Sequence, residues 1–268
     1  MVIAGLGGHP LSVICAVATR DTRGVVDLVA IDAESVHAQA WAVLEDVPVA
    51  AFRVGQPGSV ENVAAIAEIL SDYPDVPVVL EPALHCVDED EAVADSLMPA
   101  FLDLILPLTT LLVVGHHDLP RLAGYLPETA VDADEEGAAE AGADTSEGGG
   151  SGADAAQTVA RLQAHGVANV LVTGAPAHDV GGADCLYVDG GHVHAFAGAI
   201  EGRGFVGARG MLATAVSALL ARGCDVPAAV DIGREVMRDA LARGRRIGMG
   251  GVIPGVPTLL ESWPEPGR

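Results

Sequence analysis

The sequence predicts an α/β fold in which a mostly parallel sheet is covered by helices on both faces. Short apolar segments typical of strands alternate with segments of helical periodicity as far as residue 114. Polar or ionisable residues follow four of the apolar segments, which is where an open parallel sheet binds its ligands. A glycine-rich stretch at 202–223 then leads into a late helix. The 268 residues suffice for one large domain or two small ones.

The first half of the chain supplies strands and helices in alternation. Residues 11–18 form a continuous apolar run, which predicts a strand buried on both faces. Further strands are expected at 47–54, 76–80 and 111–114. Helices are expected at 33–44, directly after the N-cap residue Ser59, and around 98–106.

The second half begins with a break in this pattern. Residues 129–157 are acidic and rich in Gly and Ser, and they contain almost nothing to bury, so we predict a disordered insertion there. The insertion divides a single domain into residues 1–128 and 158–268. Beyond it, we expect a helix at 158–165, a strand at 170–172, a hairpin of 186–188 with 193–196, and a helix around 228–241.

Charge and cysteine usage limit the classes of partner and compartment. The net charge is −23, and all fourteen basic residues are Arg, so a nucleic-acid backbone would be repelled. The four cysteines are scattered without a CxxC pair, which indicates free thiols in a reducing compartment. No apolar run reaches the roughly 18 residues that span a bilayer, and no signal peptide is visible. We therefore expect a cytoplasmic protein that contacts neither nucleic acid nor membrane.

The stretch 202–223 is the strongest local candidate for a site. A glycine-rich turn that opens a helix presents unpaired N–H groups and the positive end of the helix dipole, which suit a phosphate or an oxyanion. An ordinary connection into a buried helix fits the local pattern equally well, and Arg209 favours the anion-binding interpretation. No Asp, Cys, Ser or His lies between Gly207 and Gly210, so the turn carries no nucleophile or base.

The order of elements resembles the ribokinase-like fold, and within it the hydroxymethylpyrimidine/phosphomethylpyrimidine kinases of thiamine biosynthesis. The resemblance extends over nearly all of the chain outside 129–157. It rests on TRDTRGV (19–25), AVLEDVPVAAFRVGQPGSVENV (42–63), DYPDVPVVLEPAL (72–84), LPLTTLL (106–112), VLVTG (170–174), LLARG (219–223) and RIGMG (246–250).

The resemblance implies the reaction and its partners. Members of this family transfer the γ-phosphoryl group of ATP, with Mg²⁺, to the hydroxymethyl group of an aminopyrimidine and then to its monophosphate. The implied partners are a small pyrimidine and a nucleotide, and the family implies a homodimer. Residues 1–8 match only the end of the helix that follows the family's first strand and substrate loop. We expect that strand and loop to be missing from this sequence, either because they are truly lost or because the start at Met1 is misassigned.

The resemblance also assigns site positions, several of which depart from the family's pattern. The anion-hole loop corresponds to Gly207, Ala208, Arg209 and Gly210, with Gly210 in place of the Cys or Asp that faces the reacting hydroxyl. Asp118 corresponds to a Glu that organises Mg²⁺, and Glu81 to an Asp that is a weaker metal candidate. Arg20 and Gln56 occupy substrate-facing positions, and Thr173 and Gly174 occupy the cofactor position.

Two hypotheses follow from these departures. The chain is a kinase whose chemistry depends on the loop amides and Arg209, or it is a non-catalytic pyrimidine- or nucleotide-binding paralogue (a pseudokinase) with a regulatory or scaffolding role. Loss of a general base typically lowers a rate about 10²- to 10⁴-fold. From the sequence we therefore predict negligible kinase activity on hydroxymethylpyrimidine.

Overall fold

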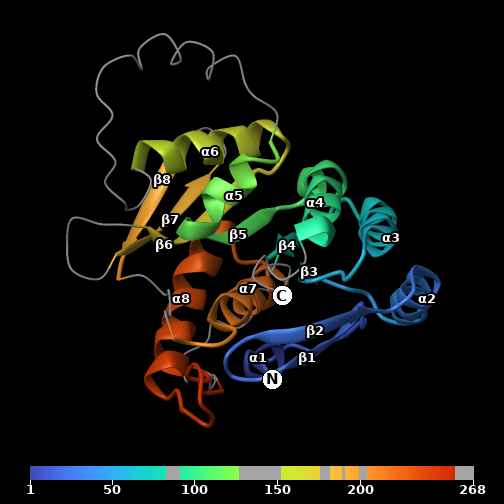
Figure 1. The fold of residues 1–268 in the computed structure, drawn as a ribbon, viewed down its shortest axis with the longest axis horizontal. Coiled ribbons are helices and arrows are strands. Elements are labelled where there is room, and N and C mark those ends of the chain that lie inside the picture. The colour runs from blue at the N-terminus through green and yellow to red at the C-terminus, as the bar shows by residue number, and fades with distance from the viewer. Residues whose placement is uncertain (83–90, 127–151, 176–181, 189–190, 199–203, 257–268) are drawn as a thin grey trace.

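The computed structural model describes residues 1–82, 91–126, 152–175, 182–188, 191–198 and 204–256, and these contain one six-stranded sheet. Its strand order is β3-β4-β5-β6-β7-β8 (Figure 1). Strands β3 to β6 are parallel to one another, and β7 and β8 continue the sheet as an antiparallel hairpin. The strands are β3 (Phe52–Val54), β4 (Val78–Leu80), β5 (Leu111–Gly115), β6 (Asn169–Ala175), β7 (Ala183–Val188) and β8 (His192–Ala197). This mostly parallel sheet and the terminal hairpin confirm the predicted fold class.

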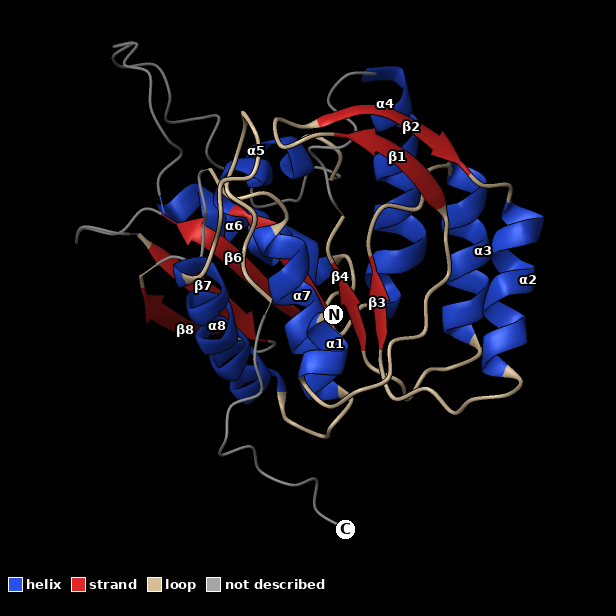
Figure 2. Ribbon diagram, turned by 90° about the horizontal axis from the view of Figure 1, so that it is seen from below, coloured by secondary structure: helices blue, strands red, loops and turns tan. Residues whose placement is uncertain are grey.

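Helices cover both faces of the sheet because alternate strand residues point to opposite sides. Val78 and Leu80 of β4 pack into a core with helices α3 to α6, whereas Val79 packs into a second core with α7 and α8. The view from below in Figure 2 places α1, α7 and α8 in front of the sheet. The helices are α1 (Val2–Gly5), α2 (Ala33–Leu44), α3 (Val60–Ser71), α4 (Glu91–Ala100), α5 (Leu119–Ala123), α6 (Gly152–Ala164), α7 (Ala208–Leu220) and α8 (Val226–Ala242).

The predicted buried strand at 11–18 is wrong in both extent and burial. The observed strand β1 (Ala16–Arg20) pairs only with β2 (Val25–Ala30), in an antiparallel ribbon that stands apart from the six-stranded sheet (Figure 2). Val17 is 55% exposed and Val29 is 57% exposed. The apolar run indicated a strand correctly, but burial depends on what packs against the strand, and the described residues leave much of this ribbon exposed.

The side chain of Asn62 connects the ribbon to the main body. Its amide nitrogen donates to the backbone carbonyls of Cys15, Ile31 and Pro57 at 2.8 to 3.1 Å, and the residue is fully buried. Its backbone N–H donates to Ser59 Oγ over 3.2 Å, as expected for the predicted N-cap of α3. One residue therefore completes the helix start and holds three loop segments together.

Several element boundaries differ from the prediction. The strand expected at 47–54 is shortened to β3, and Pro48 lacks the N–H that a longer ladder requires. Helix α4 contains Pro99 and continues as the π-helix η2 (Phe101–Ile105) and the 3₁₀-helix η3 (Leu106–Leu108). Helix α6 begins at Gly152, so the last six residues of the predicted insertion are helical, since Ala-rich sequence favours a helix. The remainder, 129–151, lies outside the described residues.

Two further expectations concern thiols and membranes. Cys15, Cys185 and Cys224 are free thiols, whereas Cys86 lies outside the described residues. Across the part of the chain that the structure describes, every helix is too short or too polar to cross a membrane.

Candidate functional site

The N-terminus of α7 forms the centre of the candidate site. Gly207 is the N-cap residue and adopts φ +75°, a left-handed conformation that favours glycine, and no side chain caps this end. The first-turn N–H groups of a helix have no intrahelical partners, and they lie at the positive end of the helix dipole. Ala208, Arg209 and Gly210 form this first turn. A helix start of this kind is suited to an anion, and anion binding by the loop stays a prediction.

Two ion pairs lie near the start of α7: one joins β3 to the residue after β4, and the other joins α7 to the turn after β5. Arg53 Nη2, from the end region of β3, lies 2.8 Å from Glu81 Oε2, which directly follows β4. Arg209 Nη1, from α7, lies 2.5 Å from Asp118 Oδ2, in the 3₁₀ turn after β5. The Glu81 and Asp118 side chains are 4% and 12% exposed. The structure thus brings together charged residues that are far apart in the sequence.

Gly210 lies against the first of these pairs. A Cβ built at Gly210 would lie 3.1 Å from Arg53 Nη2 and 3.4 Å from Glu81 Oε2. The resemblance predicts a Cys or Asp side chain at position 210. The Arg53 guanidinium and the Glu81 carboxylate therefore border the space that such a side chain would occupy. Neither contact follows from the local sequence around Gly210.

Gly115, the last residue of β5, lies against the second ion pair. A Cβ at Gly115 would overlap the Arg209 guanidinium and lie 2.8 Å from a ring carbon of His117. The absence of a side chain at Gly115 thus leaves room for Arg209 to reach Asp118. Because β5 pairs in parallel with β6, Gly115 lies beside Thr173.

A cavity of about 860 Å³ borders this cluster and is lined by Arg53 and Gln56. Its walls come from residues 7–16, α2, 47–57, α3 and the segment from Thr214 in α7 to Arg222, and they are mostly apolar. The Gln56 side-chain oxygen accepts from the Gly58 N–H at 3.4 Å, while its buried Nε2 has no hydrogen-bond partner among the described residues. Ligand cavities of this size commonly combine apolar walls with a few polar groups that orient the ligand. Gln56 is one of the polar residues of this lining, although its Nε2 atom is itself buried.

The remaining predicted positions divide into two groups. Thr173 is buried and donates to the Val114 carbonyl at 3.2 Å, and the Gly174 N–H donates to Asp184 Oδ1 at 3.0 Å, so both lie at the carboxyl end of β6. Arg20 is exposed at the end of β1 and does not line the cavity. Arg20 lies on the ribbon, and its substrate-facing role stays a prediction from the resemblance.

A buried ion pair that the sequence analysis missed lies next to the predicted cofactor position. Arg234 Nε of α8 donates to Asp184 Oδ2 at 2.8 Å, and both side chains are at most 1% exposed. The same guanidinium donates to the Gly198 carbonyl at 2.7 Å and stacks 4.6 Å from the Phe196 ring centre. The sequence feature that could have indicated this pair is Asp184, an acid within the otherwise apolar strand β7, because a buried charge requires a partner.

The carboxylates of the cluster do not by themselves form a metal site. Within the described ranges, no group of three or more His, Cys, Asp and Glu side chains could hold a metal ion. Glu81 and Asp118 are each paired with an arginine. Mg²⁺ at phosphate sites is commonly held by one or two carboxylates together with the phosphates themselves. The residues present therefore do not fit a Mg²⁺ that the protein alone would hold.

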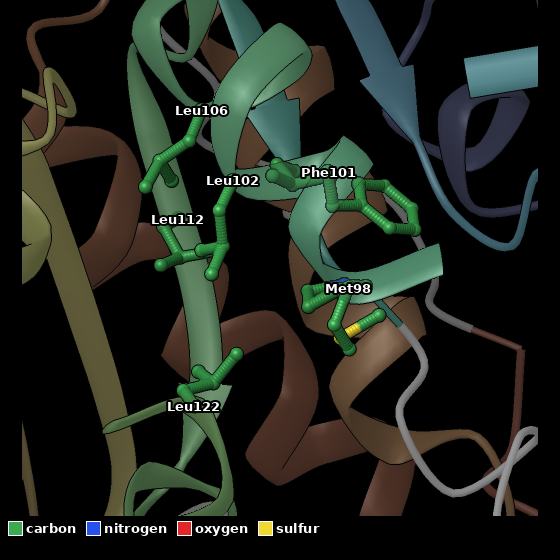
Figure 3. Close-up of a pocket in the computed structure, with 8 residues that line it drawn as sticks. Met98, Phe101, Leu102, Leu106, Leu112 and Leu122 are labelled. Atoms are coloured by element: carbon green, nitrogen blue, oxygen red, sulfur yellow. The ribbon is translucent and has the colours of Figure 1, made fainter. Parts of the chain in front are cut away.

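A second pocket is a packing gap and not a ligand site. It measures about 10 Å³ and is lined only by apolar side chains below β4 and β5, among them Met98, Phe101 and Leu112 (Figure 3). A water in a cavity needs two to four polar partners, which this lining lacks. The candidate site is thus the α7 start with the adjoining large cavity.

Comparison with known proteins identifies the family. Residues 1–147 and 139–254 match the family described as phosphomethylpyrimidine kinase. The hydroxymethylpyrimidine/phosphomethylpyrimidine kinase of Streptomyces coelicolor is 30% identical over 250 residues, which cover 93% of this chain and 83% of that protein. The enzyme of the same name from Rhizobium meliloti is 28% identical over 92% of this chain and 85% of its own length.

Solved structures agree in fold. A Bacillus subtilis pyridoxal kinase in complex with ADP has a TM-score of 0.72 at 18% identity, over 94% of this chain and 88% of that chain. The phosphomethylpyrimidine kinase of Clostridium difficile has a TM-score of 0.62 at 18% identity, over 89% of each chain. Together with the sequence matches, these similarities show that the chain belongs to the phosphomethylpyrimidine kinase family, which has a ribokinase-like fold.

Proposed function

We propose that this protein transfers the γ-phosphoryl group of ATP to hydroxymethylpyrimidine or its monophosphate in thiamine biosynthesis. The observation that carries the proposal is the position of the α7 start. Its uncapped amides and Arg209 lie at the carboxyl edge of β3 to β5, and Arg53 of the same cluster also lines a cavity of about 860 Å³. The names of the curated relatives support the substrate class. ATP as the donor is supported by a similar Staphylococcus aureus pyridoxal kinase, whose structure contains AMP-PCP and pyridoxal.

Each part of the site contributes one element of phosphoryl transfer. The reaction requires positioned reactants and stabilisation of the charge on the transferring group. The amides of Ala208, Arg209 and Gly210 and the Arg209 guanidinium would stabilise that charge. Gln56 Nε2 would donate to an acceptor nitrogen of the pyrimidine in the cavity. Thr173 and Gly174 would border the nucleotide, with Mg²⁺ bound mainly by its phosphates.

Compartment and assembly are part of the proposal. Free thiols at the three described cysteines fit a reducing cytoplasm. Exposed valines on the β1–β2 ribbon, at positions 17, 26 and 29, fit a homodimer that covers them. Light scattering at two protein concentrations would measure the oligomeric state.

The test combines turnover with binding. The purified protein is incubated with ATP, Mg²⁺ and each pyrimidine, and the product is followed by ADP release and mass spectrometry. Titration calorimetry with AMP-PCP and with the pyrimidine measures binding. The variant Q56L removes the amide donor at similar size and should weaken pyrimidine binding by about tenfold, as for a lost hydrogen bond.

Three outcomes are distinguishable. Phosphorylated pyrimidine supports the proposal. Binding of both ligands without product would support the non-catalytic pyrimidine-binding alternative and contradict the proposed reaction. Absence of both binding and product contradicts both interpretations.

A further inference from the structure

We propose that Glu81 takes over the role of the side chain missing at position 210 and accepts the proton of the substrate hydroxyl. This inference rests on the proposed function. Transfer of a phosphoryl group to an alcohol requires a group that accepts the alcohol proton. None of the residues Gly207 to Gly210 has a side chain that can do so. The base must therefore come from another element.

Glu81 is the carboxylate that the fold places at this point. Its Oε2 lies 3.4 Å from the position that a Cβ at Gly210 would occupy. A carboxylate projecting from β4 thus reaches the point from which a side chain on α7 would begin. Glu81 and Asp118 are each paired with an arginine, but only Glu81 lies within 4 Å of that Cβ position. The geometry favours Glu81 over Asp118.

Arg53 orients the Glu81 carboxylate and balances its charge. A buried carboxylate is costly unless it is paired and hydrogen-bonded, and Glu81 is only 3% exposed. Arg53 Nη2 donates to Glu81 Oε2 at 2.8 Å, and its side chain is 29% exposed and lines the large cavity. Arg53 therefore contacts both the Glu81 carboxylate and the space proposed for the pyrimidine, whereas Glu81 itself is not among the residues that line this space. In this arrangement Glu81 is the catalytic residue and Arg53 is a positioning residue.

The proposed step balances without a further reactant. The substrate hydroxyl oxygen attacks the γ-phosphorus of the nucleoside triphosphate and forms a new O–P bond. The bond from that phosphorus to the bridging oxygen breaks, and its electron pair leaves with the nucleoside diphosphate. The hydroxyl proton passes to the Glu81 carboxylate and later to solvent.

The first test removes the base without changing its shape. E81Q should lower kcat by about 10²- to 10⁴-fold. Binding of AMP-PCP and hydroxymethylpyrimidine, measured by calorimetry, should change by less than about threefold, because a base acts in the transition state and not in ground-state binding. E68Q, at an exposed position on α3, is the matched control and should leave kcat unchanged.

The second test moves the carboxylate from β4 to α7. In the double variant E81Q/G210D, the new side chain begins 3.1 Å from the end of the Arg53 side chain, which can shift to admit it. We expect kcat to recover at least about tenfold relative to E81Q. A role of Glu81 confined to folding would not predict this recovery. R53K should retain more activity than R53M, because Lys keeps a charge for Glu81.

The outcomes separate this inference from the proposed function. A wild-type protein that phosphorylates the pyrimidine, with E81Q equally active, overturns the role of Glu81 and leaves the proposed function standing. A folded, ligand-binding E81Q/G210D that remains as slow as E81Q also overturns it. A wild-type protein without turnover overturns both proposals. Thermal melting checks that each variant is folded, and if E81Q fails to fold, E81D and E81D/G210D provide the same comparison.

Discussion

Arg209 Nη1 donates to Asp118 Oδ2 over 2.5 Å and so joins the first turn of α7 to the 3₁₀ turn that follows β5. The contact passes over Gly115, where any Cβ would overlap the guanidinium. The two side chains are 19% and 12% exposed, so the pair is shielded only in part from solvent. The guanidinium is thereby held beside the amides of the helix start, where a transferring phosphoryl group is proposed to bind.

Replacement of Arg209 should therefore lower the rate more than it changes pyrimidine binding. We expect R209M to reduce kcat about 10²- to 10³-fold, as for loss of one preorganised donor to a developing charge. R209K should retain an intermediate rate, because Lys keeps the positive charge but lacks the several fixed N–H donors of a guanidinium. G115A should lower kcat with Arg209 still present, since its Cβ displaces the guanidinium. Steady-state kinetics with ADP release measures all three, and an R209M rate equal to wild type contradicts the assignment.

The buried pair of Arg234 and Asp184 should dominate the stability of the β7–β8 side of the sheet. Removal of one partner leaves an uncompensated buried charge, so R234M should reduce the free energy of unfolding by about 3–5 kcal/mol. The double variant R234M/D184L should lose less than R234M alone, because it removes both charges. Urea unfolding provides the measurement, and a loss below about 1 kcal/mol for R234M would contradict this account.

The large cavity should accept a bulky side chain where the core does not. Ala40 of α2 lines the cavity and is 7% exposed, whereas Ala67 of α3 packs in a core cluster and is 8% exposed. A40F should weaken pyrimidine binding by about tenfold or more with little change in stability, because it fills space meant for a ligand. A67F should destabilise the fold by about 1–3 kcal/mol. Calorimetry measures pyrimidine binding and thermal melting measures stability for both variants. If A40F and A67F changed binding and stability equally, the result would argue against this ligand site.

The N-cap of α2 should contribute a pH-dependent stabilisation. The Ser35 N–H donates to Asp32 Oδ1 at 2.8 Å, and this hydrogen bond lowers the pKa of Asp32 below its ordinary value of 3.8. A lowered folded-state pKa means that the stabilisation is complete above 3.8 and is lost as the pH falls through the folded-state pKa.

The control for this prediction is D32N, since Asn also caps a helix but does not titrate. The melting temperature of the wild type should exceed that of D32N near neutral pH, because an ionised N-cap also interacts with the helix dipole. The difference should shrink as the pH is lowered from about 6 to about 2. A difference that is constant with pH would show that ionised Asp32 contributes nothing.

Local sequence patterns predicted the elements whose partners are close in the chain. The periodicity of 33–44 gave the observed bounds of α2, and the Ser59 N-cap placed the start of α3. The hairpin of β7 and β8 and a glycine-rich turn leading into α7 were likewise predicted, because turn glycines and alternation are encoded by adjacent residues. The order of these elements sufficed to indicate the ribokinase-like fold.

Burial and pairing were decided only by the tertiary structure. The apolar run at 11–18 gave an exposed ribbon instead of a buried strand, and Arg20 consequently lies outside the cavity lining. The pairing of Arg53 with Glu81 spans 28 positions of sequence, and that of Arg209 with Asp118 spans 91. A sequence pattern records the preference of a segment for helix or strand, whereas the charge that faces a carboxylate depends on how distant segments pack. The sequence determined that position 210 has no base, and the packing of β4 against α7 determined which carboxylate lies beside it.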